Sequence, residues 1–256
     1  MENRDLLLFS PKTPIHIAGP CSVESAEQIE ETAAFLSKFG VPVLRGGTFK
    51  ARTFSSSFQG LGEEGILMLA RAAHHNGMAC VTEVMNEDQL AFALPHVDMV
   101  QVGARSMFNY PLLTAIGKAG IPVILKRGMG ATIDEWLAAS EYIATEGNPN
   151  IILCERGIRS FETATRFTLD VAAIPIARRR SVFPVIVDPS HAAGESSLVF
   201  PLARAAMAAG ASGIMVEVHP DPLLALSDGK QSLDFQSFEL LHRELTAVCN
   251  ALESLK

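Results

Sequence analysis

The sequence predicts a single-domain (β/α)8 barrel, an α/β fold of the TIM-barrel type. Along the 256 residues, short apolar runs alternate with amphipathic stretches, and eight of these runs have the length of a strand. The runs are continuously apolar rather than alternating, as parallel strands buried on both faces should be. Eight such units fit the usual size of one barrel.

Residues 1–14 form a short lead-in, and residues 15–256 are predicted to form the barrel, with no added regulatory domain. The predicted strands are Ile15–Ala18, Val41–Arg45, Ala79–Glu83, Met99–Val102, Pro122–Lys126, Ile151–Glu155, Pro184–Asp188 and Gly213–Val218. The helices predicted between and after them are Ala26–Phe39, Glu63–Asn76, Glu87–Leu94, Tyr110–Lys118, Ile133–Thr145, Leu198–Ala209 and Phe235–Leu252.

Local signals support this order of elements. Several predicted helices are followed by a glycine, such as Gly40, Gly77 or Gly210, which is a common helix stop. The stretch Gly157–Phe183, which carries Arg159, Arg166 and Arg178–Arg180, is the least regular and is expected to be part of the mouth or of an interface. A doubly wound open sheet is the alternative, but no G-x-G-x-x-G motif follows the first strand.

Composition excludes several classes of protein. The formal net charge of -7 disfavours nucleic acid as a general partner, and the four cysteines form no CxxC pair, so we expect neither a disulfide framework nor a zinc ribbon. The N-terminus lacks a signal-peptide pattern. The most apolar region, Leu198–Val218, is interrupted by Arg204, Glu217 and two glycines and should not span a membrane. The sequence therefore predicts a soluble, cytoplasmic protein.

Polar residues lie at or just after the C-terminal ends of all eight predicted strands, which is where the chemistry of such barrels lies. In strand order they are Cys21-Ser22; Arg45, Lys50 and Arg52; Glu83; Gly103-Ala104-Arg105; Lys126-Arg127; Glu155-Arg156; Asp188 and His191; and Glu217, His219 and Asp228. The stretch after the second strand, VLRGGTFKARTFSSSFQG, combines cations with glycines that let a ligand approach the backbone.

Five cations from five strand ends point to one mouth: Arg45, Lys50, Arg105, Lys126 and Arg156. This density of like charge predicts a site for a multiply charged anion. The alternatives are a solvated basic loop and salt bridges to neighbouring acids.

A second set combines a thiol, an imidazole and two carboxylates: Cys21, His191, Glu217 and Asp228. These donors suit a divalent transition metal. The residues are far apart in sequence, so no local motif supports the site. Glu155 and His219 are alternative ligands, and Cys21 alone would more often be an inert buried thiol.

Eight motifs together resemble the 3-deoxy-D-arabino-heptulosonate 7-phosphate (DAHP) synthases, in the short branch related to 3-deoxy-D-manno-octulosonate 8-phosphate synthase. The motifs are IAGPCSVES, LRGGTFKARTFSSSFQG, QVGARSMFN, LKRGM, IILCERGIRSFE, VDPSHAAG, VEVHPDP and ALSDGKQSLDF. The resemblance implies a (β/α)8 barrel that condenses phosphoenolpyruvate with erythrose 4-phosphate at the start of the shikimate pathway. It also implies a homo-oligomer, a dimer or a tetramer.

The resemblance assigns roles residue by residue. It implies that Cys21, His191, Glu217 and Asp228 bind a divalent metal ion (manganese, iron, zinc or cobalt). It implies that the five cations bind phosphoenolpyruvate, with further substrate contacts from Glu83, Gly103, Ala104 and Asp188. Lys126, Cys21 and His191 would be the catalytic residues, and Arg52 and Thr53 would hold the erythrose 4-phosphate end.

One position departs from the family pattern. Ala51 stands where the family usually has proline in Lys-Pro-Arg-Thr, which is closer to the Lys-Ala-Asn-Arg of the octulosonate branch. An octulosonate synthase that uses arabinose 5-phosphate is therefore the alternative. Two other classes remain open: an aldolase with a lysine Schiff base, and a barrel retained only to bind a partner. The expected lack of a regulatory domain also predicts insensitivity to aromatic amino acids, chorismate and prephenate.

Overall fold

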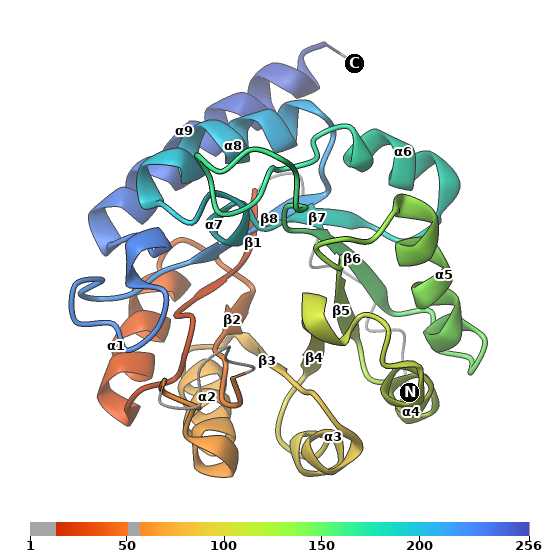
Figure 1. Ribbon diagram of the computed structural model, residues 1–256. Coiled ribbons are helices and arrows are strands. Elements are labelled where there is room, and N and C mark those ends of the chain that lie inside the picture. The colour runs from red at the N-terminus through yellow and green to blue at the C-terminus, as the bar shows by residue number, and fades with distance from the viewer. Residues whose placement is uncertain (1–13, 51–56, 256) are drawn as a thin grey trace.

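Eight parallel strands close into a barrel in the order β1 to β8, and β8 pairs with β1 (Figure 1). The computed structural model describes residues 14–50 and 57–255. The strands are β1 (Ile15–Gly19), β2 (Val43–Arg45), β3 (Ala79–Glu83), β4 (Met99–Val102), β5 (Val123–Lys126), β6 (Ile151–Glu155), β7 (Val185–Val187) and β8 (Gly213–Glu217). The predicted fold class is confirmed.

Helices surround the ring of strands (Figure 1). In the described residues they are α1 (Ala26–Ser37), α2 (Gly62–His75), α3 (Glu87–Ala93), α4 (Tyr110–Ala119), α5 (Ile133–Ala144), α6 (Ala173–Arg180), α7 (Pro189–Ala193), α8 (Ser196–Ala208) and α9 (Phe235–Glu253), with 3-10 turns η1 (Ala104–Ser106) and η2 (Gly229–Gln231). Across the described parts of the chain, no helix has the length and apolar character needed to cross a bilayer.

The core has two layers. Side chains that point into the ring, such as Ile17, Val81 and Ile124, form a cluster inside the barrel. A larger cluster lies between strands and helices. Here Trp136 of α5 is fully buried, and its indole N–H donates to the carbonyl of Leu125 at 3.1 Å. This dense interior fixes the strand ends from which the site is built.

Prolines explain why three predicted strands begin too early. Pro42, Pro122 and Pro184 directly precede β2, β5 and β7, and proline has no N–H to donate to the ladder. Their carbonyls still accept hydrogen bonds from Ala79, Val100 and Leu153. At the end of β7, Asp188 caps α7 instead of extending the strand, because its side chain accepts from the His191 N–H.

Two short helices were not predicted. The stretch 157–183, expected to be irregular, contains α6, which buries Ala173, Ile174 and Ala177. Pro175 lies in its first turn, where a missing N–H leaves no intrahelical bond unmade. The other is α7, which carries His191 directly after β7. The other predicted helix bounds agree to within two residues.

Candidate active site

The predicted site residues that the structure describes converge at the C-terminal mouth of the barrel. Arg45, Lys126 and Glu217 are the last residues of β2, β5 and β8, Cys21 follows β1, and His191 lies in α7. A pocket in this mouth, called the mouth pocket below, is lined by Glu83, Gly103, Ala104, Arg105, Lys126, Met129, Arg156, Arg166, Phe167 and His191. Seven of these residues were predicted from the sequence.

Four side chains form a compact donor group: Cys21, His191, Glu217 and Asp228. One ligand atom from each lies within 4.8 Å of the others. The Cys21 thiol lies 3.2 Å from Asp228 Oδ2, and His191 Nε2 lies 3.5 Å from Glu217 Oε1. One sulfur, one imidazole nitrogen and two carboxylates make a donor set that fits a divalent transition metal.

Two cations lie directly against this donor group. The guanidinium of Arg45 contacts Glu217 Oε1 at 2.5 Å, and the ammonium of Lys50 lies 2.8 Å from the Cys21 sulfur. Burial raises the pKa of the Cys21 thiol to about 12, with a further contribution from the charge of Glu217. Arg45 and Lys50 therefore offset negative charge in the donor group, in addition to facing any bound anion.

Asp188 orients the His191 ring. Asp188 is fully buried, its Oδ1 accepts the His191 backbone N–H at 3.0 Å, and its Oδ2 lies 2.8 Å from His191 Nδ1. This contact leaves Nε2 directed at the donor group, which is the usual arrangement of a metal-binding histidine. Lys126 also contacts Asp188 Oδ2, at 2.5 Å. Asp188, expected to contact substrate, is not among the residues that line the mouth pocket.

Arg156 presents a buried donor to the mouth pocket. Its guanidinium lies 4.2 Å from the centre of the Phe167 ring, and the residue is 5% exposed. Within the described part of the chain, its Nη1 has no hydrogen-bond partner. Burial lowers the pKa of Arg156, partly offset by Asp188. A buried cationic donor without a partner is unfavourable, so this atom favours an anionic ligand.

Gly103 permits the close packing of Glu83. A Cβ at position 103 would lie 2.2 Å from Glu83 Oε1. The other Glu83 oxygen accepts from Gln101 Nε2 at 2.8 Å. A side chain at position 103 would therefore displace a carboxylate that lines the pocket.

Comparison with known proteins agrees with this geometry. Residues 11–253 match the sequence profile of the DAHP synthetase I family. This chain belongs to that family. The chain is 56% identical to the phospho-2-dehydro-3-deoxyheptonate aldolase of Thermotoga maritima over 236 residues, which cover 92% of this chain and 70% of the relative. It is 34% identical to a 2-dehydro-3-deoxyphosphooctonate aldolase of Rhodopseudomonas palustris, over 90% of this chain and 85% of the relative.

Solved structures agree as well. The crystal structure of the Thermotoga maritima DAHP synthase superposes with a TM-score of 0.90 at 56% identity, covering 93% of this chain and 70% of that one. A truncated form of the 3-deoxy-D-arabino-heptulosonate 7-phosphate synthase from the same organism gives a TM-score of 0.86 at 53% identity, covering 92% of this chain and 86% of that one.

In this DAHP synthetase I chain, the two alternative ligands lie outside the donor group. Glu155 is fully buried and pairs with Arg127 at 3.0 Å, and its other oxygen accepts the Gly157 N–H at 2.7 Å. His219 Nε2 lies 3.3 Å from Glu24 Oε2. Both side chains thus have structural partners of their own.

Arg166, Phe167 and Gln231 were not among the predicted site residues, although the segment that carries Arg166 was expected to lie at the mouth or an interface. Arg166 and Phe167 line the mouth pocket from the segment between β6 and α6. Gln231, in η2, donates to Glu217 Oε2 at 2.5 Å. They follow no strand directly, so the rule that located the other site residues does not reach them. Arg52 and Thr53, expected to hold the aldose, lie outside the described residues.

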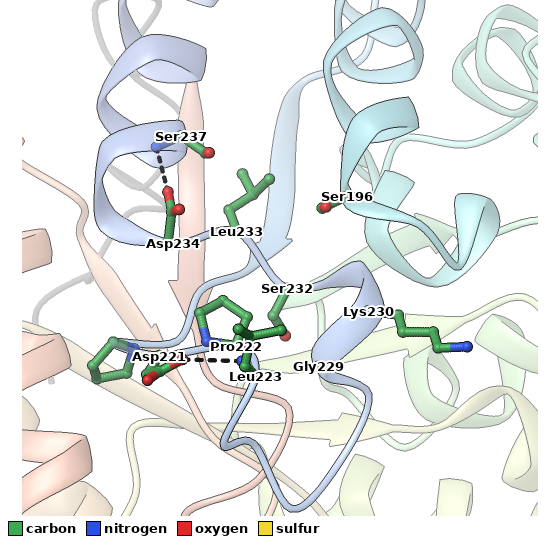
Figure 2. Close-up of a pocket in the computed structure, with 11 residues that line it drawn as sticks. Ser196, Asp221, Pro222, Leu223, Gly229, Lys230, Ser232, Leu233, Asp234 and Ser237 are labelled. Carbon is green, nitrogen blue, oxygen red and sulfur yellow. Dashed lines mark hydrogen bonds between the residues drawn. The ribbon is translucent and has the colours of Figure 1, made fainter.

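Two other features lie away from the mouth pocket. Figure 2 shows a pocket beside the loop after β8, lined in part by Asp221, Lys230 and Asp234. Asp234 is already engaged, because it accepts from the Ser237 N–H as the cap of α9. The second feature is a cluster of His74, Cys80 and Asp98 near the starts of β3 and β4. None of the predicted site residues takes part in either feature.

Proposed function

We propose that this chain condenses phosphoenolpyruvate with D-erythrose 4-phosphate and water, giving DAHP and inorganic phosphate, and that it requires a divalent metal ion. The observation that carries the proposal is the buried, unpartnered Arg156 donor in a cationic pocket that shares His191 with the donor group. The family match limits the reactions this arrangement would serve.

The cations bind and orient phosphoenolpyruvate. Arg105, Lys126 and Arg156 line one pocket, where they would hold the phosphate and carboxylate and stabilise charge during the reaction. Holding the two substrates in one geometry lets C3 of phosphoenolpyruvate form a bond to the aldehyde carbon. Water then adds at C2 and gives up one proton, while the former aldehyde oxygen gains one and becomes a hydroxyl. The C2–O bond of the resulting hemiketal phosphate breaks, C2 becomes a carbonyl, and the proton of its hydroxyl leaves with the phosphate.

The metal ion would be held by the four donors Cys21, His191, Glu217 and Asp228. Manganese, iron, zinc and cobalt would all fit this donor set. When bound there, the ion supplies a Lewis acid that polarises the aldehyde oxygen. Asp188 fixes the His191 ring and holds the Lys126 ammonium at the edge of the pocket. We assign Lys126 as the group that donates a proton to the phosphate oxygen on C2 as the C2–O bond breaks, and that regains a proton from the C2 hydroxyl, because its ammonium is anchored while it lines the site.

Initial rates test the choice of aldose. We expect a clear preference for erythrose 4-phosphate over arabinose 5-phosphate. Arg52-Thr53 matches the heptulosonate pattern, and the 56% identical relative is named a phospho-2-dehydro-3-deoxyheptonate aldolase. The octulosonate reaction is the second candidate, because Ala51 and the relative from Rhodopseudomonas palustris point that way. Preference for arabinose 5-phosphate would overturn the proposal.

Two further experiments test the Schiff-base alternative and the oligomeric state. Borohydride with substrate should trap no adduct on Lys126, because the proposed reaction uses no Schiff base. We also propose a homo-oligomer, a dimer or a tetramer. Light scattering coupled to size exclusion tests this, and a monomer at micromolar concentration would contradict it.

A further inference from the structure

Arg166 lies in a segment that is tied to the end of α7. The N–H groups of Arg166 and Phe167 donate to the carbonyls of Ala193 and Ala192, at 3.2 and 2.9 Å. A Cβ at Gly194, which has a φ of +73°, would lie 2.6 Å from the Arg166 Cβ. The glycine lets the segment pack this closely. The backbone of Arg166 is therefore held beside the helix that carries His191.

The Arg166 side chain reaches two of the four donors. Its Nη1 donates to Gln231 Oε1 at 2.8 Å and lies 3.6 Å from Asp228 Oδ2. Gln231 is 2% exposed, and its Nε2 donates to Glu217 Oε2 at 2.5 Å. One guanidinium thus contacts one carboxylate donor directly and the other through a single buried amide.

Asp228 has an uncommon backbone conformation. Among residues 14–50 and 57–255, it is the one non-glycine residue with a positive φ, at 51°. This left-handed region is uncommon for residues with a Cβ, although aspartate adopts it more readily than most of them. The Gln231 N–H and the Ser232 hydroxyl both donate to the Asp228 carbonyl, at 3.2 and 3.3 Å. Arg166 approaches the carboxylate itself and pairs with the amide of Gln231.

We propose that Arg166 is a positioning residue for the metal site, acting directly on Asp228 and through Gln231 on Glu217. The inference rests on the metal ion of the proposed function. Residues that hydrogen-bond to metal ligands commonly change metal affinity by about 10- to 100-fold when they are replaced. Arg166 has the geometry for this role on two ligands at once.

A direct substrate contact is the competing role, because Arg166 also lines the mouth pocket beside Arg156 and Lys126. The two roles predict different measurements. A positioning residue changes the affinity for metal alone, in the absence of substrate. A substrate contact changes the KM of one substrate and leaves the metal affinity unchanged.

The test titrates Mn2+ into metal-stripped protein by calorimetry, without substrate. Arg166→Met and Gln231→Met should each weaken Mn2+ binding about 10- to 100-fold. The double variant should weaken it by less than the product of the two single effects, because part of the Arg166 effect passes through Gln231. Arg166→Lys, which keeps the charge, should lie between wild type and Arg166→Met. Arg159→Met, an exposed arginine of the same segment, is the matched control and should bind as wild type does.

Three results would overturn the role. The first is an unchanged Mn2+ affinity in Arg166→Met. The second is a loss of Mn2+ affinity in the double variant equal to the product of the two single losses. The third is a raised KM of Arg166→Met for one substrate at saturating Mn2+, with no change in its Mn2+ affinity. Wild-type protein that binds no Mn2+ would overturn the metal site and the role of Arg166 together. Wild-type binding with unaltered variants would overturn the role alone. Circular dichroism and urea midpoints verify that the variants fold, as expected for a side chain that is 35% exposed.

Discussion

Replacing Arg156 by methionine should change stability and substrate binding in opposite directions. In the free protein, Arg156 is a buried cation whose Nη1 lacks a partner among the described residues, a situation that costs about 1–3 kcal/mol. Arg166 adds repulsion, while Asp188 and the Phe167 ring add attraction. The ring contact is worth roughly 0.5–2 kcal/mol, and methionine keeps part of it through its sulfur. We therefore expect Arg156→Met to raise the free energy of unfolding by about 1 kcal/mol.

The same change should weaken phosphoenolpyruvate binding. A hydrogen bond to a charged group contributes about 1.5–3 kcal/mol, which corresponds to a roughly 10- to 150-fold rise in the apparent KM for phosphoenolpyruvate. Urea unfolding without substrate and initial rates with varied phosphoenolpyruvate measure the two effects. Arg71→Met on α2, an exposed arginine, is the control for the general effect of removing a cation. A variant destabilised by more than about 1 kcal/mol, or one with an unchanged KM, would refute the reasoning.

Three further predictions concern metal, a buried ion pair and acid stability. Treatment with a chelator should abolish turnover, and added Mn2+ should restore it. The Cys21→Ala variant should have a normal urea unfolding curve but bind Mn2+ poorly in calorimetry. Full activity of metal-free Cys21→Ala would contradict this prediction. Arg127→Met should lower the free energy of unfolding measured in urea by about 3–5 kcal/mol, because it leaves the charge of the fully buried Glu155 unpaired. Adding Glu155→Gln should recover part of the loss. An Arg127→Met variant as stable as wild type would contradict the importance of this ion pair. Burial alone would raise the pKa of Asp98, but hydrogen bonds from His74 and the Cys80 N–H lower it below its ordinary value of about 3.9. The ionised Asp98 side chain therefore stabilises the fold at neutral pH. That contribution is lost as the pH falls through the lowered pKa. Asp98→Asn should therefore be less stable than wild type at pH 7 in urea unfolding, with a difference that shrinks towards pH 3; a constant difference would contradict the assignment.

Residues that end a strand could be located from the sequence. Each buried run has a definite last residue, and in a closed barrel those ends meet at one mouth. Placing Arg45, Lys126 and Glu217 together therefore required only the order and length of the strands. The same argument brought Cys21 and His191 into one group, and the structure places their ligand atoms within 4.8 Å.

The choice of partner for each side chain could not be predicted. Arg45 pairs with Glu217 across 172 positions of the chain, and Lys50 lies against Cys21. Several cations and carboxylates share the mouth, so sequence order does not decide which atoms meet. The cations and the predicted metal ligands, which the sequence suggested as two separate sets, are therefore linked by direct contacts.

In segments without a regular hydrophobic pattern, neither the individual site residues nor the short helix could be predicted from the sequence. Arg166 reaches the site because two backbone hydrogen bonds tie its loop to α7, and no local pattern encodes that path. Helix α6 could not be recognised in the sequence, because its short apolar face is interrupted by Pro175 and followed by the three arginines 178–180. Packing against the barrel, rather than intrinsic helix propensity, stabilises such a short helix.

The donor group lies across the seam where the ring of strands closes. Cys21 follows the first strand, while Asp228 follows the last and lies 207 positions further along the chain. During synthesis the thiol emerges from the ribosome long before its three companions, and the four atoms cannot meet until β8 has paired with β1. Ion uptake would therefore be a late event in refolding, slower than the appearance of helical signal, because it waits for a contact between residues 207 positions apart.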